Sequence, residues 1–206
     1  FIFICDFISY DMVSLPSLHT NYNSGYTKSQ EKYSYFIGFK IYKNNYEKIN
    51  AVKLNMYMDR LRELRNNRNI TQATLSSLLE IHEYVYGQYE REYVIIPLKH
   101  LNTLSNYFNV SLDYIFEFTN TINYEFTNTE INSLLSGQRL KEFRKDNKLS
   151  QVKLATLLNT VQPVIANYEN GKHLIATPFL YQICKKYSIS ADYLLGKIDS
   201  PKYLNK

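Results

Sequence analysis

The sequence is poor in the residues that build covalent crosslinks, metal sites and phosphate-binding loops. Its two cysteines, Cys5 and Cys184, lie far apart, and neither has a second cysteine or a histidine at metal-ligand spacing, so we expect neither a disulfide framework nor a zinc site. Six glycines form no glycine-rich phosphate loop, and no nucleophile motif occurs. The histidines are scattered at His19, His82, His100 and His173. The sequence thus predicts a protein of the reducing cytoplasm that is not an enzyme and has no metal and no cofactor.

A long apolar run is also missing. The first fifteen residues are apolar, but Asp6 and Asp11 interrupt them and no basic segment precedes them. A spanning helix needs roughly 20 apolar residues, so we expect neither a signal peptide nor a membrane partner. The chain opens on Phe1 and not on methionine. We therefore expect a fragment, or a reading frame extended upstream of a start near Met56 or Met58.

What the sequence does hold is the composition of a soluble globular protein. With 206 residues, 45% hydrophobic and 21% charged, the chain has room for one or two domains with cores of their own. Its 24 basic residues exceed its 19 acidic residues, giving a net charge of +5. This excess suits an anionic partner such as nucleic acid, without requiring one.

An internal repeat organises most of the chain. A shift of 79 residues superimposes identical or similar residues over nearly sixty positions without a gap. The matches include Arg60 with Arg139, Arg65 with Arg144, Gln72 with Gln151, Tyr89 and Glu90 with Tyr168 and Glu169, and Asp113 with Asp192. Since chance does not hold a register over such a length, the chain contains two copies of one domain.

Each copy reads as five short helices. In the second copy, Ser150 and Ser190 stand at N-cap positions before apolar runs, and a third helix from about Val161 to Glu169 ends at Asn170 and Gly171. A fourth helix is predicted to begin near Pro178.

The first copy repeats the pattern with Thr71 and Ser111 as caps and Pro97 at the start of its fourth helix. The stretch between the copies, about Glu117 to Asn132, has no Lys or Arg and is rich in Thr and Asn. The expected organisation is an N-terminal segment, poorly structured or a non-native extension, a domain, a linker, a second domain and a tail, at residues 1–55, 56–118, 119–134, 135–197 and 198–206.

The second and third helices, with Gln at the start of one and Tyr and Glu at the end of the next, resemble the Cro and lambda-repressor (XRE-type) family of helix-turn-helix domains. The resemblance covers residues 58–116 and 137–196. In the second copy it is carried by Arg139, Leu140, Arg144, Ser150, Gln151, Leu154, Ala155, Tyr168, Glu169, Asn170, Gly171, Ser190, Asp192, Tyr193 and Leu194. It implies an all-α fold of two tandem five-helix domains and a transcriptional regulator, expected to be a repressor, that binds double-stranded DNA.

By this resemblance, the third helix of each copy enters the major groove and reads bases. The base-reading residues would be Gln162, Pro163 and Asn167 in the second copy and Glu83, Tyr84 and Gln88 in the first. Phosphate contacts would come from Gln72, Gln151, Lys148, Lys153, Asn170 and Lys172. The competing interpretation is that these are solvent-facing polar residues of ordinary helices.

Two acid–base pairs have a structural role in the family. The resemblance implies partly buried ion pairs between Arg144 and Glu169 and between Arg65 and Glu90, each tying the first helix of a copy to the end of the third. We therefore assign these four residues to stability and not to DNA contact.

The copies differ in charge. Leu135 to Lys197 carries ten Lys and Arg against four Asp and Glu, whereas Met58 to Phe116 carries six against seven. Since DNA affinity rests on neutralised phosphates, the second copy is the better candidate binder. In the first copy, either Gly87 lets the helix approach DNA closely with another sequence preference, or this copy contacts protein; we favour DNA contact by both.

The alternative function is a non-catalytic interaction module. An antitoxin-like protein, for example, would use the first copy to bind another protein. Either reading is compatible with a homodimer.

Overall fold

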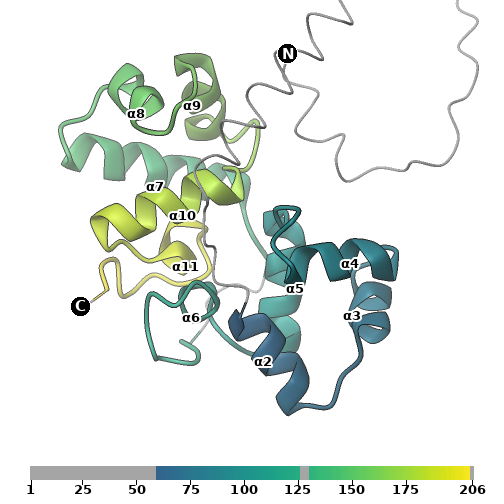
Figure 1. Ribbon diagram of the computed structural model, residues 1–206. Helices are drawn as coiled ribbons and strands as arrows, with labels where there is room; N and C mark the ends of the chain where they lie inside the picture. The colour runs from purple at the N-terminus through teal and green to yellow at the C-terminus, as the bar shows by residue number, and fades with distance from the viewer. Residues whose placement is uncertain (1–58, 126–129, 205–206) are drawn as a thin grey trace, which may run out of the picture. The chain divides into compact units, whose positions relative to one another are not determined.

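The computed structural model describes residues 59–125 and 130–204. The prediction for residues 1–55 lies outside this range. All the described residues belong to one compact unit, in which helices follow one another without any strand (Figure 1). The predicted all-α class is confirmed.

Ten helices in the described residues form two sets of five. The first domain holds α2 (Asp59–Asn67), α3 (Gln72–Leu78), α4 (Glu83–Glu90), α5 (Leu98–Phe108) and α6 (Leu112–Ile115). The second holds α7 (Ser133–Asp146), α8 (Gln151–Leu157), α9 (Gln162–Glu169), α10 (Thr177–Tyr187) and α11 (Ala191–Leu194). Both ends of α3, α4, α5 and α6 recur 79 residues later in α8, α9, α10 and α11. The two five-helix domains expected from the repeat are therefore present.

The predicted hydroxyl caps begin four of these helices. Thr71 and Ser150 accept a hydrogen bond from the backbone N–H three residues later, each at 3.1 Å. Ser111 and Ser190 do the same at 3.0 Å. A cap of this kind is worth about 1 kcal/mol because it satisfies a backbone donor that has no partner within the helix. That contribution matters for helices of four to seven residues, which are not stable alone.

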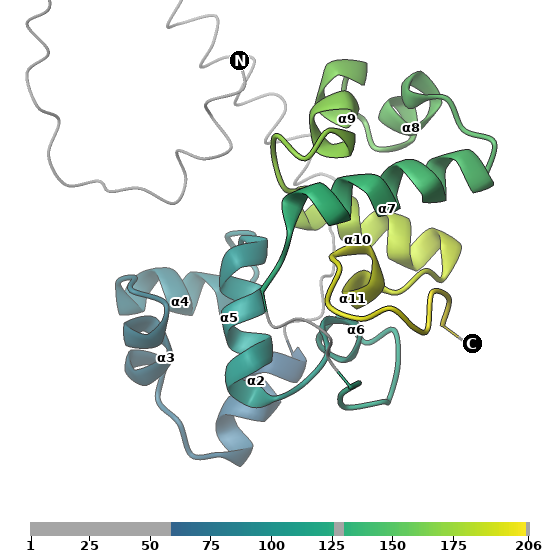
Figure 2. The ribbon, with the colours of Figure 1, turned by 180° about the vertical axis from the view of Figure 1, so that it is seen from behind.

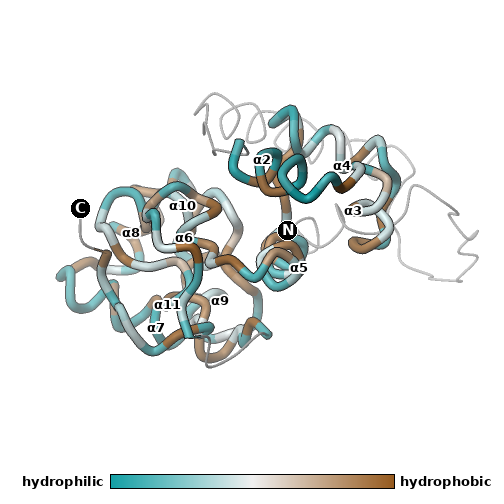
Figure 3. The backbone as a smooth tube through the Cα atoms, turned by 90° about the horizontal axis from the view of Figure 1, so that it is seen from below, coloured by the Kyte–Doolittle hydropathy of each residue, from teal (hydrophilic) through white to brown (hydrophobic). Residues whose placement is uncertain are grey.

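Each domain has its own apolar core. Leu75 of α3 and its counterpart Leu154 of α8 are fully buried, as are Leu104 of α5 and Ile183 of α10. In the second domain α9 packs on both α7 and α8, and α7 lies between the α8–α9 pair and α10 (Figure 2). Hydrophobic and hydrophilic residues alternate along the helices (Figure 3), as expected for helices that bury one face.

The repeat extends to the turns. Backbone φ is positive at five positions of the first domain and again 79 residues later in the second. The pairs are Asn69 and Lys148, Glu80 and Asn159, Glu92 and Gly171, Asn109 and Ser188, and Glu117 and Gly196. This left-handed conformation favours Gly and Asn, yet Glu, Lys and Ser occupy half of the positions. The same backbone is kept by different residues.

Segments expected to be linker and tail pack on the domains. Ile122 accepts a hydrogen bond from the backbone of Ser111 at 2.7 Å, and α7 begins at Ser133. At the other end Ile198 is fully buried, and an isolated antiparallel bridge joins Ile189 to Tyr203. The exact domain bounds remain a prediction.

Within residues 59–125 and 130–204, every helix is too short or too polar to cross a bilayer. Over the same part of the chain, no group of three His, Cys, Asp or Glu side chains is placed to hold a metal ion.

Candidate nucleic-acid interface

In the second domain α8 and α9 are joined by a turn of four residues. Asn159 takes a left-handed conformation there, with φ of 53°. Val161 caps α9, and Pro163 lies in its first turn, where a missing backbone N–H costs nothing. This helix begins one residue later than the sequence predicts.

The three predicted base-reading residues of this domain lie on α9. Pro163 is exposed, whereas Gln162 and Asn167 are partly exposed. Val161, at the start of the helix, is 63% exposed. The start of α9 therefore presents both polar and apolar groups to a partner.

A chain of hydrogen bonds runs from this surface into the domain. The Gln162 amide donates to Gln151 Oε1 at 2.7 Å, and the Gln151 amide donates to Glu169 Oε2 at 2.9 Å. Glu169 in turn receives two hydrogen bonds from the Arg144 guanidinium. The predicted phosphate-contacting residue Gln151 is thus held between α9 and the buried ion pair.

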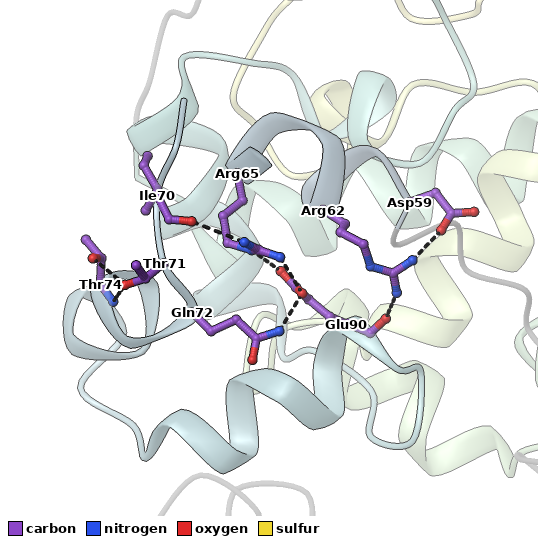
Figure 4. Close-up of polar contacts among 8 residues, drawn as sticks. All are labelled: Asp59, Arg62, Arg65, Ile70, Thr71, Gln72, Thr74 and Glu90. Carbon is purple, nitrogen blue, oxygen red and sulfur yellow. Dashed lines mark hydrogen bonds and ion pairs between the residues drawn. The ribbon is translucent and has the colours of Figure 1, made fainter. Parts of the chain in front are cut away.

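The two predicted ion pairs are confirmed. In the first domain Arg65 Nε lies 2.6 Å from Glu90 Oε1, and a second hydrogen bond of 3.0 Å makes the contact bidentate (Figure 4). Arg144 and Glu169 repeat this geometry in the second domain. The four side chains are 1% to 15% exposed, so losing one partner should be costly.

The ion pairs keep the glutamates ionised. Burial alone would raise the pKa of Glu90, but hydrogen bonds from Arg65 and Gln72 outweigh it, and the pKa is lowered. Burial acts against Glu169 in the same way, and hydrogen bonds from Arg144 and Gln151 lower its pKa. The glutamines at the starts of α3 and α8 therefore help to hold the charges that fix the helices.

The first domain lacks the surface part of this chain. Gln72 donates to Glu90 at 2.7 Å (Figure 4), but Glu83 stands where the second domain has Gln162. An ionised carboxylate has no hydrogen to donate to a glutamine oxygen. The two domains thus share the buried half of the network and differ at the outer half.

Gly87 lies beside the glutamine at the start of α3. It is buried, and a Cβ atom added there would lie 3.3 Å from Gln72 Oε1. A close approach of α4 to DNA at Gly87 stays a prediction.

The outer face of α4 carries the remaining predicted residues. Glu83 is exposed, Tyr84 is 66% exposed and Gln88 is partly exposed. Leu78, at the end of α3, is 37% exposed. The exposed surface of α3 and α4 thus combines an acidic side chain, Glu83, with the large apolar side chains of Tyr84 and Leu78.

Three lysines lie at or near the ends of the helices α7, α8 and α9. Lys148 follows α7, Lys153 lies in the first turn of α8, and Lys172 follows α9. All three are exposed, as is Asn170. The predicted phosphate-contacting side chains of this domain are therefore accessible, apart from the partly exposed Gln151.

Arg60 and Arg139 are equivalent in the repeat, but no role was predicted for them from the sequence. The Arg139 guanidinium donates to the carbonyls of Tyr193, at 2.6 Å, and Ile198, and it lies 4.3 Å from the centroid of the Tyr193 ring. Arg60 contacts Tyr114 in the same way. The recurrence of this arginine at the 79-residue shift was the available sign of a structural role.

Comparison with known families agrees with this geometry. A family model described as "Helix-turn-helix" matches residues 61–115, and one described as "Helix-turn-helix domain" matches residues 137–200. The chain carries two tandem XRE-type helix-turn-helix domains. In these domains α3–α4 and α8–α9 are the helix-turn-helix units.

Curated relatives resemble parts of this tandem helix-turn-helix chain. It is 39% identical over 64 residues to "Uncharacterized HTH-type transcriptional regulator YobD" of Bacillus subtilis (strain 168), a match that covers 31% of this chain and 57% of the relative. It is 28% identical over 61 residues to "Antitoxin PezA" of Streptococcus pneumoniae, covering 30% of this chain and 39% of that protein. The chain thus spans less than two thirds of either relative. No solved structure matches it.

Proposed function

We propose that this chain is a sequence-specific, double-stranded-DNA-binding transcriptional regulator that acts as a repressor in the cytoplasm, without catalysis or cofactor. The supporting observation is the second domain's surface, where Gln162 and Asn167 on α9 are flanked by exposed lysines. The similarity to a protein named as an HTH-type transcriptional regulator agrees with this function.

In this mechanism α9 enters the major groove, which admits a helix. Gln162 and Asn167 have amides that can form paired hydrogen bonds to adenine, and each such contact discriminates by about 1–3 kcal/mol. Lys148, Lys153 and Lys172 neutralise phosphates, which provides affinity without sequence preference. Gln151 and Asn170 complete the backbone contacts.

The first domain would bind through α4 in the same manner. Glu83 can accept a hydrogen bond from cytosine, while Tyr84 and Gln88 contact neighbouring positions. Gln72 would bond a phosphate. With a net charge of −1 between Met58 and Phe116, this domain contributes less affinity than the second.

Two substitutions in the second domain separate base reading from phosphate binding. We expect Asn167→Ala to weaken binding to the preferred duplex by about 1–3 kcal/mol while leaving binding to random duplexes unchanged. Lys148→Ala should weaken binding to all duplexes alike and reduce the steepness with which affinity falls as salt rises. Gel-shift titrations at several salt concentrations measure both effects.

Thr156→Ala provides the control, since Thr156 is an exposed α8 residue whose hydroxyl bonds its own helix. Its duplex affinity should equal that of the unaltered chain. Equal binding of the unaltered chain to every duplex in a random set would contradict a sequence-specific regulator.

A second candidate function concerns the first domain alone. Its exposed Tyr84 and Leu78 and its slight negative charge suit a protein partner better than a phosphate backbone, and one relative is named an antitoxin. If the first domain binds protein, Glu83→Ala and Gln88→Ala will leave the DNA affinity of the full chain unchanged. If it binds DNA, each will alter the sequence preference at one end of the site.

A further inference from the structure

The two helix-turn-helix domains contact each other through the starts of their last helices. The Asp113 carboxylate accepts hydrogen bonds from the Ala191 backbone N–H, at 2.7 Å, and from the Ser190 hydroxyl. The Asp192 carboxylate accepts from the backbone N–H groups of Leu112, at 3.1 Å, and Asp113, at 2.9 Å. Each short helix is therefore capped by the aspartate of the other domain. We call these residues, 111–113 and 190–192, the α6–α11 junction.

A second set of contacts is reciprocal at the level of helices. Phe118, just after α6, places its ring 5.1 Å from the ring of Tyr181 in α10. Lys197 is the repeat equivalent of Phe118, and its ammonium reaches α5, the equivalent of α10, where it donates to Ser105 Oγ at 2.8 Å and to Asn106 Oδ1 at 3.2 Å. Each domain thus places a side chain from three residues beyond its last helix on the fourth helix of the other.

Reciprocity of this kind defines the symmetry of the pair. In a two-fold contact, residue i of one unit touches residue j of the other while j touches i, whereas a head-to-tail contact uses two different surfaces. The aspartate contacts pass this criterion residue by residue, since Asp113 touches Ala191 and Asp192 touches Leu112. The second set passes it only at the level of helices. The contacts therefore indicate that the two domains are related by a pseudo-two-fold axis at the α6–α11 junction.

The side chains at this contact are not symmetric, and the difference disfavours pairing of two first or two second domains. Two second domains paired in this way would place Lys197 beside Cys184 and Lys185, the equivalents of Ser105 and Asn106. Lys197 is fully buried, so it would lose its oxygen acceptors and gain a nearby positive charge. Two first domains would set Phe118 against Asn102, the equivalent of Tyr181. Only a first and a second domain are complementary.

We propose that the α6–α11 junction makes a single chain an internal pseudo-dimer that reads one duplex carrying two unlike half-sites in inverted order. The part that concerns DNA rests on the proposed function. The arrangement of half-sites follows from the symmetry, since the symmetry of a DNA site mirrors that of the protein bound to it. The half-sites differ because α4 and α9 carry different outer residues. One chain suffices because the junction is already occupied from within.

A double-mutant cycle tests the junction without DNA. Asp113→Ala and Ser190→Ala are made singly and together in the full chain, and unfolding is followed in urea. We expect the two changes to be non-additive, by a factor of about five or more in the unfolding equilibrium constant, because the residues contact each other across the domains. Asp113→Ala combined with Thr71→Ala, which removes a cap away from the junction, should be additive. Additivity of the Asp113 and Ser190 changes would overturn the junction; Asp113→Asn replaces Asp113→Ala if the latter does not fold.

The DNA arm begins with duplexes selected by the full chain from a random pool. One half of the enriched sequence is then reversed to give a direct repeat, or moved by 5 base pairs, which is half a helical turn. We expect each change to weaken binding at least about tenfold, and sedimentation to give one chain per duplex. Equal binding to inverted and direct arrangements, or two chains per duplex, would overturn the proposal. Failure to enrich any sequence would instead refute the proposed function, and the mutant cycle would still decide the junction.

Discussion

Glu92 and Gly171 occupy equivalent places after α4 and α9, and both have positive φ, 59° and 69°. A side chain in this conformation brings its Cβ close to the following carbonyl, which costs roughly 1–2 kcal/mol relative to glycine. The backbone of the turn is thus preserved in the first domain with a less suitable residue.

Glu92→Gly should therefore stabilise the chain. Part of the relief is offset because glycine is freer in the unfolded state, so we expect the free energy of unfolding to rise by about 0.5–1 kcal/mol. Urea denaturation measures it. Arg91→Gly is the matched control, because Arg91 has φ of −91° and glycine should destabilise there. Stabilisation by both changes, or by neither, would contradict the role of the left-handed conformation.

How well individual residues could be predicted depended on the range of their interactions. The caps at Thr71 and Ser150 were foreseen because a hydroxyl bonds a backbone group only three residues away. The two ion pairs were foreseen from the resemblance. The left-handed Glu92 was not, because Glu carries no preference for that conformation. Of the candidate site, the sequence identified the helices and the lysines, while the Gln162–Gln151 hydrogen bond depends on how α8 and α9 pack.

At the scale of helices, α7 and α9 approach each other closely in the second domain. Gly137, in α7, has no side chain because a Cβ atom would lie 2.3 Å from the Tyr168 carbonyl oxygen and 2.9 Å from that of Glu169. Those carbonyls belong to the last turn of α9. The packing of α7 thus sets the position of α9.

Gly137→Ala tests this packing. In an exposed helix the change would stabilise by about 1 kcal/mol, but here the backbone atoms cannot move aside as a flexible side chain would. We expect a loss of at least about 2 kcal/mol in unfolding free energy, together with weaker DNA binding. Gln138→Ala, at the exposed neighbour, should change stability by less than about 0.5 kcal/mol. A stabilised Gly137→Ala chain would show that α7 and α9 are not held so closely.

At the scale of the whole molecule, the junction concentrates ionisable groups away from water. Asp113, Asp192 and Lys197 are all fully buried. Burial, together with the charge of Asp192, raises the pKa of Asp113 well above its ordinary value, and burial raises the pKa of Asp192 while Lys197 opposes the shift. Burial lowers the pKa of Lys197. A single proton shared by the aspartates would leave the group neutral with the lysine charged.

The stability of the chain should therefore depend on pH through this group. A folded-state pKa above the unfolded value of 3.8 means that the folded chain binds the extra proton more tightly. The stabilisation that this bound proton gives to the folded chain is complete below about pH 4. It is lost as the pH rises toward the folded-state pKa. Asp113→Asn mimics the protonated carboxyl, so its unfolding free energy should fall less with rising pH than that of the unaltered chain. Parallel pH profiles of the two would exclude the shared proton.

The junction itself was beyond the reach of the sequence. Asp113 and Asp192 were matched as repeat equivalents, but two residues at equivalent places in a tandem repeat carry no indication that the copies touch. Their contact depends on the direction in which the second domain folds back on the first. Local patterns of caps, apolar positions and turns contain no information on that direction.

The separation of Asp113 and Asp192 along the chain also sets a delay between their synthesis on the ribosome. Asp192 leaves the ribosome 79 residues after Asp113, which at about 5–20 residues per second is a delay of roughly 4–16 s. Throughout that interval the first domain is present without its partner, and the surface that Lys197 and Asp192 later cover remains open to water and to chaperones. The capping of α6 is thus completed by a residue translated several seconds after the helix itself.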